Sequence, residues 1–344
     1  MADFKIVAIY PWQTEIWRQI NAMRRNLPHA LLLQGRKGVG KLEFARALAQ
    51  GLLCETPLPS GEGCGKCLAC GWLAQGNHPD FRSVEPEVLT EAEDDKPAKG
   101  KKPSHEIKIE QIRELAGLVS LSTHRNGMRV ILIHPAEAMN TNAANALLKT
   151  LEEPPPQTLI MLVTHQAQAL LPTVRSRCLK LAFPVPPLAQ ATVWLHQQGV
   201  ADPAPFLAQA GYAPLAAQAL SGDELQELRQ AFLSQLARPQ ALDPIALAEK
   251  NEKMDLPNMV LWLQQWLYDL IGCRLSGLIR YQPDFAAEVR ALAPHIPLQA
   301  ALTFQKELLA AQKIVHHPLN TQLFLEQLLL SYMQLMNLIE SDHG

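Results

Sequence analysis

The sequence lacks the features that would mark a membrane protein or a secreted one. None of its apolar runs reaches the roughly eighteen residues that a membrane-spanning helix needs. The N-terminus, MADFKIVAIYPWQ, has only a short apolar run, an acidic residue at Asp3 and no small-residue cleavage site, which is not the pattern of a signal peptide. Both absences favour a cytoplasmic protein with no membrane partner.

An excess of charge of one sign is also missing. The chain has 31 Lys and Arg residues against 33 Asp and Glu residues, a formal net charge of -2. This balance excludes a general electrostatic attraction to nucleic acid but leaves room for a local basic patch. With 48% hydrophobic and 19% charged residues, the chain should be globular. At 344 residues it is too long for one ordinary core, and we expect two or three domains.

The pattern of apolar residues divides the chain into three parts. Up to Phe183, strand-like runs alternate with amphipathic helices, which is typical of an α/β domain with a parallel sheet. The expected strands are Ala30–Gln34, Arg129–His134, Thr158–Thr164 and Cys178–Phe183. Pro184–Pro187 reads as a linker. Everything after it has a helical pattern, so we predict parts at 1–183, 184–222 and 223–344, the last with an N-cap at Asn320.

Two stripes of apolar residues recur at helical spacing in the third part. We interpret them as core or helix-partner surfaces without chemistry. They comprise Met259, Val260, Leu263, Leu267, Leu270 and Ile271, and Leu323, Leu325, Leu328, Leu329, Tyr332 and Leu335.

A charged stretch interrupts the first part at Glu85–His105. It holds three prolines and no apolar period, and an acidic half precedes a basic half, so we expect a mobile loop at about 85–105. The basic half is compatible with contact to DNA phosphates, but a solvated loop whose charges offset each other explains it more simply.

A phosphate-binding loop is suggested near the start of the chain. The strand-like run Leu31–Leu33 leads into a turn with Gly35, Gly38 and Gly40, and Lys41 then opens a helix. In this order backbone N–H groups and a lysine surround phosphates. The next residue should be Ser or Thr, which binds Mg²⁺, but it is Leu42. Lys41 either retains some nucleotide contact or caps nearby carbonyl groups of a vestigial loop.

The rest of an ATPase site is also incomplete. Hydrolysis needs an acidic metal ligand at the end of a second strand. The only suitable strand is Arg129–Ile133, and His134 and Pro135 follow it where an Asp-Glu pair is needed. Glu137 comes two positions too late, so we expect His134 and Glu137 to have ordinary surface and helix-start roles. Mg²⁺ is therefore not expected.

Four cysteines lie close together, at Cys54, Cys64, Cys67 and Cys70. Two-residue gaps let neighbouring thiolates reach one ion, and four thiolates around Zn²⁺ make a closed structural site. A disulfide pair is disfavoured because nothing indicates secretion. An iron–sulfur cluster has no flanking proline or redox partner to support it. We expect a structural zinc module at about 54–70, and core positions for Cys178 and Cys273.

Two further motifs carry a resemblance to a known family. The segment NALLKTLEEPP at Asn145–Pro155 and the tripeptide Ser176-Arg177-Cys178 resemble the characteristic motifs of bacterial clamp-loader AAA+ subunits of DNA polymerase III. The four-cysteine knuckle after the first loop helix is similar to theirs. The resemblance implies an AAA+ P-loop domain with an inserted zinc knuckle, then a small helical lid and an all-α collar domain that joins the subunits.

The departures from the family pattern point to one class of subunit. The family's motor subunits carry Thr after the loop lysine, Asp-Glu after the second strand, and a sensing arginine in the lid. This chain has Leu42, then His134 and Pro135, and Pro214 roughly at the lid position. It looks like the non-hydrolysing delta-prime class, so ATP binding is doubtful and the isolated chain should not be an enzyme.

The resemblance gives Arg177 a role outside its own subunit. In the family, the arginine of Ser-Arg-Cys is a finger that reaches the ATP site of the neighbouring subunit. The alternative is an arginine paired with a local carboxylate or a helix end, and Arg175 competes for either role. Lys149, Glu152 and Glu153 form either a charged helix face or an inter-subunit surface. Thr164 stands at the position of a strand-end polar sensor and can equally cap the strand.

The resemblance also implies the partners. They are the motor (gamma/tau) and delta subunits in a hetero-oligomer, and the sliding clamp and primer-template DNA through the complex, during DNA replication. Two alternatives remain. One is an ATP-hydrolysing motor subunit that binds Mg²⁺ through unusual groups, and the other is a free-standing zinc-containing DNA-binding protein.

Overall fold

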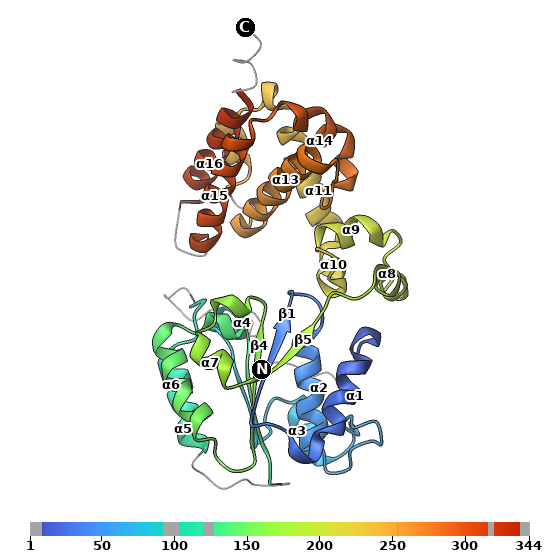
Figure 1. Ribbon diagram of the computed structural model, residues 1–344, viewed down its shortest axis with the longest axis vertical. Coiled ribbons are helices and arrows are strands. Elements are labelled where there is room, and N and C mark those ends of the chain that lie inside the picture. The colour runs from blue at the N-terminus through green and yellow to red at the C-terminus, as the bar shows by residue number, and fades with distance from the viewer. Residues whose placement is uncertain (1–8, 92–102, 120–126, 253, 316–319, 338–344) are drawn as a thin grey trace. The chain divides into compact units, whose positions relative to one another are not determined.

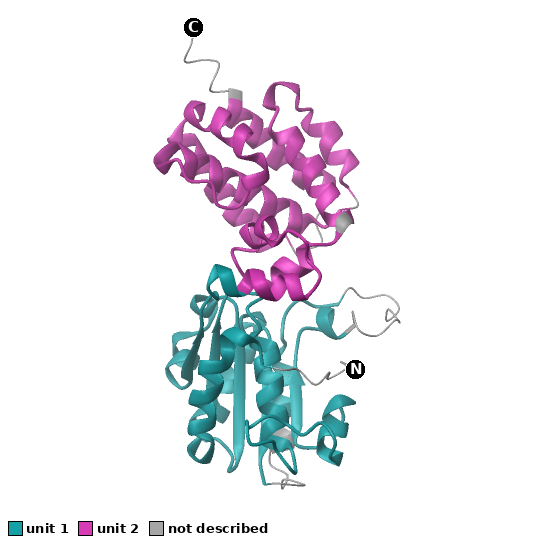
Figure 2. Cartoon of the chain, turned by 90° about the vertical axis from the view of Figure 1, so that its right-hand side faces the viewer, with its two compact units in different colours: residues 1–190 teal, residues 191–344 magenta. Residues whose placement is uncertain are grey.

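The computed structural model describes residues 9–91, 103–119, 127–252, 254–315 and 320–337 (Figure 1). The chain forms two compact units, Met1–Gln190 and Ala191–Gly344 (Figure 2). Within the described ranges, no helix combines the length and the apolar character needed to cross a membrane.

The first unit is built on one five-stranded sheet. Its strands are β1 (Ala30–Gly35), β2 (Phe81–Val84), β3 (Arg129–Ile133), β4 (Thr158–Thr164) and β5 (Leu179–Phe183). Its α-helices are α1 (Thr14–Ala22), α2 (Lys41–Leu53), α3 (Leu68–Ala74), α4 (Glu87–Glu91), α5 (Ile109–Val119), α6 (Thr141–Glu152) and α7 (Pro172–Ser176). Short 3-10 turns include η1 (Pro11–Gln13) and η3 (Ala136–Ala138).

The strand order is β2-β3-β4-β1-β5, and every pair is parallel. The predicted fold class is thereby confirmed for this unit as an α/β domain with a parallel sheet. The four expected strands are present, while β2 was not predicted. Its sequence, FRSV, is short and lies at the edge of the sheet, so only its two end residues are buried.

Helices cover both faces of the sheet, which explains why the central strands are apolar without alternation. Helices α5, α6 and α7 lie on one side and α1, α2 and α3 on the other (Figure 1). Leu32 contributes to the core under α5, α6 and α7. On the α2 side, the Phe44 ring contacts Phe183 and Trp17 edge to face, with ring centroids 4.9 and 5.4 Å away. The sheet is therefore a buried platform, and its strand ends hold the loops.

The cysteine-containing excursion between α2 and α3 is fastened to the first two helices. The Arg24 guanidinium donates to the carbonyl oxygens of Gly51 and Gly61. The Trp17 indole N–H donates to the carbonyl oxygen of Ser60 at 2.8 Å. A Cβ on Gly51 would lie 2.2 Å from the carbonyl oxygen of Gly61, so the excursion packs directly on the backbone of α2.

The charged segment at 85–105 is only partly described. Residues 92–102 lie outside the described ranges. The flanks differ from the loop that the composition suggests, because 87–91 form helix α4. The Glu87 carboxylate accepts a hydrogen bond from the backbone N–H of Ser104 at 2.9 Å and pairs with the Lys108 ammonium at 2.6 Å. These contacts fasten the two ends of the segment to each other.

The second unit is helical throughout its described residues, as the sequence predicts. Its helices are α8 (Leu188–Gln197), which begins just before the unit boundary, α9 (Pro203–Gln209), α10 (Pro214–Leu220), α11 (Asp223–Leu236), α12 (Pro244–Lys250), α13 (Leu256–Ser276), α14 (Ala286–Leu292), α15 (Leu298–Ile314) and α16 (Thr321–Asn337). The predicted cap of α16 is confirmed, since Asn320 Oδ1 accepts the backbone N–H of Leu323 at 3.0 Å.

Both predicted apolar stripes lie largely in the core of this unit. Trp266 of α13 and Tyr332 of α16 are fully buried at its centre. The indole N–H of Trp266 donates to the Tyr332 hydroxyl at 3.0 Å, and that hydroxyl donates to the Leu236 carbonyl at 2.7 Å. Leu323 is an exception because its side chain is 62% exposed. The polar ends of both aromatic side chains are thus satisfied within the apolar core.

The small helical part at 184–222 belongs mostly to the same unit. The Gln265 side chain on α13 donates to the carbonyl oxygen of Gln209, at the end of α9, with a separation of 2.8 Å. The Gln209 side-chain oxygen accepts from Gln226 of α11 at 3.1 Å. Helices α9, α11 and α13 are therefore joined by one buried polar chain.

The close contact at Gly51 provides a test of this packing. We expect Gly51→Ala to destabilise the protein by about 1–3 kcal/mol, because the added methyl group would overlap a backbone oxygen. Gly71 lies in α3 with nothing within 4 Å of its Cβ position, so Gly71→Ala should be neutral or stabilising. Urea denaturation of both variants compares them, and equal stabilities would contradict the packing described.

Candidate functional site

The candidate site lies where the carboxyl ends of β1, β3 and β4 meet. The loop from Gly35 to Gly40 follows β1, His134 follows β3, and Thr164 ends β4. Parallel sheets of this kind bind ligands outside the carboxyl ends of their strands. The residues that the sequence analysis assigns to nucleotide binding are therefore brought together by the fold.

The glycines of the loop are required by its backbone. Gly38 and Gly40 have φ angles of 82° and 85°, in the left-handed region that favours glycine. A Cβ on Gly40 would lie 2.6 Å from the Gln13 amide nitrogen and 2.6 Å from the Tyr10 ring. The turn thus needs glycine at both positions, and at Gly40 the side chains of Gln13 and Tyr10 leave no space for a Cβ.

Residues 10–13 cover part of this loop, a feature that the sequence analysis did not anticipate. The Trp12 indole N–H donates to the Val39 carbonyl at 3.0 Å. The Gln13 side chain, only 1% exposed, donates to the carbonyls of Val39 at 3.1 Å and Gly40 at 2.7 Å. Nothing in the pattern of Pro11–Gln13 signals a partner about 27 residues away, so only the fold reveals the contact.

Lys41 is turned toward its own loop. The side chain is 2% exposed, and its ammonium donates to the carbonyl oxygens of Gly35 at 2.7 Å and Arg36 at 2.5 Å. Burial lowers the pKa of Lys41 to about 8, although Glu137 and Glu43 oppose the shift. Two of the three ammonium donors therefore serve the loop itself, which is the carbonyl-capping arrangement considered in the sequence analysis.

No acidic pair stands at the end of β3. The half-buried Leu42 offers no oxygen, and the Glu137 carboxylate accepts the backbone N–H of His165 at 2.8 Å. The His134 and His165 rings pack edge to face, with centroids 5.3 Å apart. Glu137 lies in the first turn of η3, as its expected helix-start role requires, and both Glu137 and His134 are half-buried beside Lys41.

The two histidines are neutral at physiological pH. Burial lowers the pKa of His134 to about 4, and the positive charges of Arg46, Lys41 and Lys37 act in the same direction. Burial likewise lowers the pKa of His165 to about 3. A neutral imidazole is a poor substitute for the carboxylate that holds Mg²⁺. Thr164 Oγ1 accepts the backbone N–H of Gln166 at 3.1 Å, which is the strand-capping role.

The four clustered cysteines meet in space as their spacing predicts. The sulfur atoms of Cys54, Cys64, Cys67 and Cys70 all lie within 4.8 Å of one another. Four thiols at this separation match the donor set of a tetrahedral structural metal site such as that of zinc. The remaining two cysteines lie elsewhere, with Cys178 buried in the core of the first unit and Cys273 partly buried against that of the second.

Backbone N–H groups point at the sulfur atoms, as a thiolate site requires. Cys64 Sγ lies 3.4 Å from the N–H groups of both Lys66 and Cys67, and Cys54 Sγ lies 3.3 Å from that of Cys64. Hydrogen bonds from Thr56, Lys66 and Cys67 lower the pKa of Cys64 to about 6. Burial raises the pKa of Cys54 and of Cys70, so Cys64 can supply a thiolate in advance while those two thiols would release their protons as a metal ion such as zinc binds.

The Ser-Arg-Cys motif closes helix α7 and leads into β5. Ser176 Oγ and Arg177 Nη1 both donate to the Thr173 carbonyl at 3.0 Å, and Cys178 Sγ donates to the Val174 carbonyl at 3.3 Å. Arg177 Nη2 also donates to Glu152 at the end of α6, at 2.5 Å. All three motif side chains thus bond carbonyl groups of α7, and the Val174 carbonyl also accepts the backbone N–H of Arg177 at 3.2 Å.

The other two candidates from the sequence analysis occupy less open positions. Arg175 is half-buried, and its Nε atom has no hydrogen-bond partner among the described residues. Pro214 is buried at the start of α10, where it can neither donate a hydrogen bond nor carry a charge.

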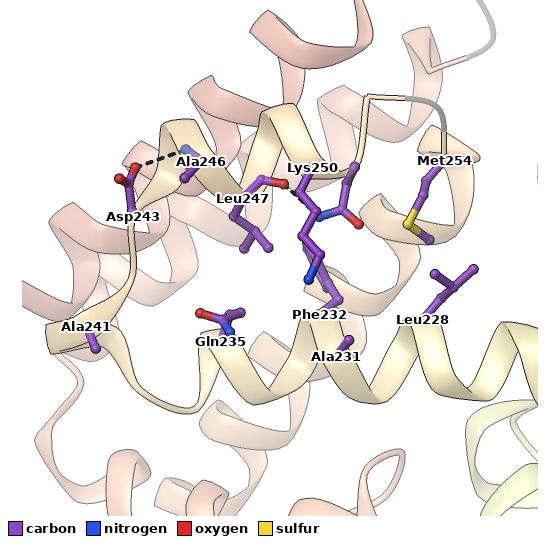
Figure 3. A pocket seen from close by; sticks show the side chains of 11 residues that line it. Leu228, Ala231, Phe232, Gln235, Ala241, Asp243, Ala246, Leu247, Lys250 and Met254 are labelled. Carbon is purple, nitrogen blue, oxygen red and sulfur yellow. Dashed lines mark hydrogen bonds between the residues drawn. The ribbon is translucent and has the colours of Figure 1, made fainter.

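A separate hollow of about 280 Å³ opens in the second unit between α11 and α12 (Figure 3). Its walls are largely apolar, with Phe232 and Met254 among them. Asp243 at its rim caps α12 by accepting the N–H groups of Ile245 and Ala246, both at 3.0 Å. The Asp243 carboxylate, the one carboxylate among the lining residues, is therefore used in capping α12. The residues that line the hollow do not form a catalytic site.

The low pKa values of the two histidines give a testable pH dependence. An imidazole whose pKa is depressed by folding stabilises the native state above its unfolded pKa of about 6.5 and loses that contribution as the pH falls. By pH 5 the free energy of unfolding should have fallen by about 2 kcal/mol for each ring. NMR titration, with signals assigned through His134→Asn and His165→Asn, should show both rings neutral at pH 5. Midpoints near 6.5 would contradict the burial described.

Comparisons with known proteins agree with this geometry. Residues 12–187 match a family model described as "DNA polymerase III, delta subunit", and residues 223–334 match one described as "DNA polymerase III, delta subunit, C terminal".

Full-length relatives extend the match to the whole chain. The chain is 37% identical to DNA polymerase III subunit delta' of Pseudomonas aeruginosa, over 95% of this chain and 98% of that protein. It is 31% identical to the Escherichia coli subunit delta', over 85% of this chain and 86% of that protein. It is also 36% identical to the E. coli subunit tau, over 44% of this chain and 21% of tau. The chain belongs to the DNA polymerase III delta' family.

Proposed function

We propose that the chain acts as the non-hydrolysing delta-prime subunit of a DNA polymerase III clamp loader, in the cytoplasm, and supports ATP-dependent loading of the sliding clamp onto DNA. The observation that carries the proposal is the state of Lys41. Its ammonium is bonded to the carbonyls of Gly35 and Arg36 rather than directed at a ligand. A nucleotide would have to displace these bonds before Lys41 could contact its phosphates.

The surroundings of Lys41 support the absence of hydrolysis. Phosphoryl transfer depends on a metal ion that bridges the phosphate oxygens and on a group that orients water. Leu42 and His134 stand where the family's motor subunits have metal ligands, and neither offers an oxygen. The half-buried His134 ring is also surrounded by positive charges, which disfavour a cation at this place. The loop then serves as a structural junction between β1 and α2.

The active contribution of the chain is Arg177, which we assign as an arginine finger for the ATP site of a neighbouring subunit. Its side chain is 36% exposed at the end of a short helix. A guanidinium that contacts a transferring phosphoryl group spreads positive charge over it, and such fingers accelerate hydrolysis by roughly 10³- to 10⁵-fold. Arg175 is the weaker candidate because it is more closely enclosed by the chain.

The second unit is the part that we assign to assembly with motor (gamma/tau) and delta subunits. On α13, Leu261, Tyr268 and Leu275 are exposed at intervals of seven residues. This spacing places them on one face of the helix, where a partner helix can cover them. The sliding clamp and primer-template DNA are reached through the assembled complex, since the net charge of -2 gives this chain no general affinity for DNA.

Zinc is the ion that we assign to the four-cysteine cluster. Its role is to hold the excursion between α2 and α3, because the four-thiol donor set leaves no open position for a reacting molecule. We expect the purified protein to contain about one zinc ion per chain, and Cys67→Ser to lose it while Cys273→Ser retains it. Elemental analysis by mass spectrometry measures this. An iron content with visible absorption, or retention of zinc by Cys67→Ser, would contradict the assignment.

The finger role is tested in a reconstituted clamp loader. We expect Arg177→Ala to lower the DNA- and clamp-stimulated kcat for ATP by at least about 10-fold, because the neighbouring site loses a charge in its transition state. The KM for ATP should change little, since the finger acts mainly in the transition state. Gel filtration before each assay distinguishes a lost finger from a lost subunit.

A matched control is Arg175→Ala, which removes the adjacent arginine of the same helix. Its turnover should remain close to that of the unchanged complex. If Arg177→Ala assembles and hydrolyses ATP normally, the finger role is wrong and the chain contributes only as a scaffold. If Arg175→Ala alone lowers turnover, the role belongs to Arg175.

A further inference from the structure

The assigned finger is held by a carboxylate from another helix of the same subunit. Glu152 is the last residue of α6, and Arg177 directly follows α7. Arg177 Nη2 lies 2.5 Å from Glu152 Oε1, while Nη1 donates to the Thr173 carbonyl at 3.0 Å. The guanidinium is therefore fixed at two points, one on each helix.

This arrangement leaves the outer part of the guanidinium available. Arginine has five N–H donors, and the two recorded bonds use one on each terminal nitrogen. The side chain is 36% exposed. An anion that approaches from outside the subunit can thus be bound by the remaining donors without breaking either contact.

The support beneath Glu152 is rigid. The side-chain oxygen of Asn140 caps the start of α6 by accepting the backbone N–H of Ala143 at 2.9 Å. Leu147 and Leu151 of the same helix are buried against the sheet. The backbone that carries the carboxylate is therefore held by the core of the unit, whereas α7 is only five residues long.

The ion pair between Glu152 and Arg177 contributes little to the stability of the fold. Both side chains are at least one third exposed, and solvent-screened ion pairs in such positions contribute little to folding. A free arginine side chain, by contrast, has rotamer entropy that must be lost when it is placed in a site. Holding the guanidinium before a neighbour arrives removes part of that cost from the catalytic step.

We propose that Glu152 is a positioning residue for Arg177, holding the guanidinium in the orientation from which it meets the phosphates of the neighbouring subunit. This inference rests on the finger role proposed above. Glu152 does not contact the nucleotide in this account and acts only through Arg177. Its carboxylate oxygen is needed as a hydrogen-bond acceptor on a fixed helix end.

The chain provides a matched control in the adjacent residue. Glu153 carries the same charge one position later, is exposed, and makes no side-chain hydrogen bond to another residue that the structure describes. Glu152→Ala and Glu153→Ala therefore remove equal charge from the same helix end, but only the first releases Arg177. Glu152→Gln retains an acceptor oxygen without the charge.

The experiment measures DNA- and clamp-stimulated ATPase activity in the reconstituted complex. Glu152→Ala should lower kcat roughly three- to tenfold with KM for ATP within about twofold, because orientation is lost but the arginine remains. Glu152→Gln should recover most of the rate, and Glu153→Ala should match the unchanged complex. Gel filtration and thermal unfolding verify assembly and folding for each variant.

A double-mutant cycle separates this inference from the finger role itself. In the Arg177→Ala background, Glu152→Ala should have no further effect. If Arg177→Ala lowers turnover but Glu152→Ala does not, positioning by Glu152 is wrong and the finger stands. If Glu152→Ala lowers turnover equally in both backgrounds, Glu152 acts on the neighbour directly and the inference is overturned. If Arg177→Ala has no effect, both roles fall together.

Discussion

The conformation of the loop at Gly35–Gly40 depends on the hydrogen bonds between the Lys41 ammonium and the carbonyl oxygens of Gly35 and Arg36. A buried ammonium needs acceptors, and these are the carbonyls that the left-handed glycine turn brings within reach. Trp12 and Gln13 donate to the carbonyls of Val39 and Gly40, at the far end of the loop. These hydrogen bonds hold the loop in its conformation without a bound phosphate. A loop that depended on its ligand would lack them.

The loop at Gly35–Gly40 and the partly exposed Arg177 are both positioned by the same sheet. The sheet that places the loop at the end of β1 also places α6 and α7 beside each other on one face. Leu42 and His134 are both accommodated, half-buried, in that framework. In the function proposed above, the domain presents Arg177 to a neighbour and has no turnover of its own.

Much of this was predictable from the sequence because it is encoded locally. Uninterrupted apolar runs predicted β1, β3 and β4, and the two-residue gaps between cysteines predicted the cluster. The short edge strand β2 carries too few apolar residues to be recognised. The cover over the loop and the partner of Arg177 depend on residues 25 or more positions apart. The partial burial of His134 and Glu137 was not predictable for the same reason, since it depends on neighbouring strands.

The most direct test of the account is ATP hydrolysis by the purified chain alone, with Mg²⁺, beside its Lys41→Ala variant. Any activity that comes from a contaminating enzyme is the same in both preparations. The account predicts no difference between them, because Lys41 serves the loop and neither Leu42 nor His134 offers an oxygen to Mg²⁺. Turnover that the Lys41→Ala substitution abolishes would contradict it, and would make this chain a motor subunit in its own right.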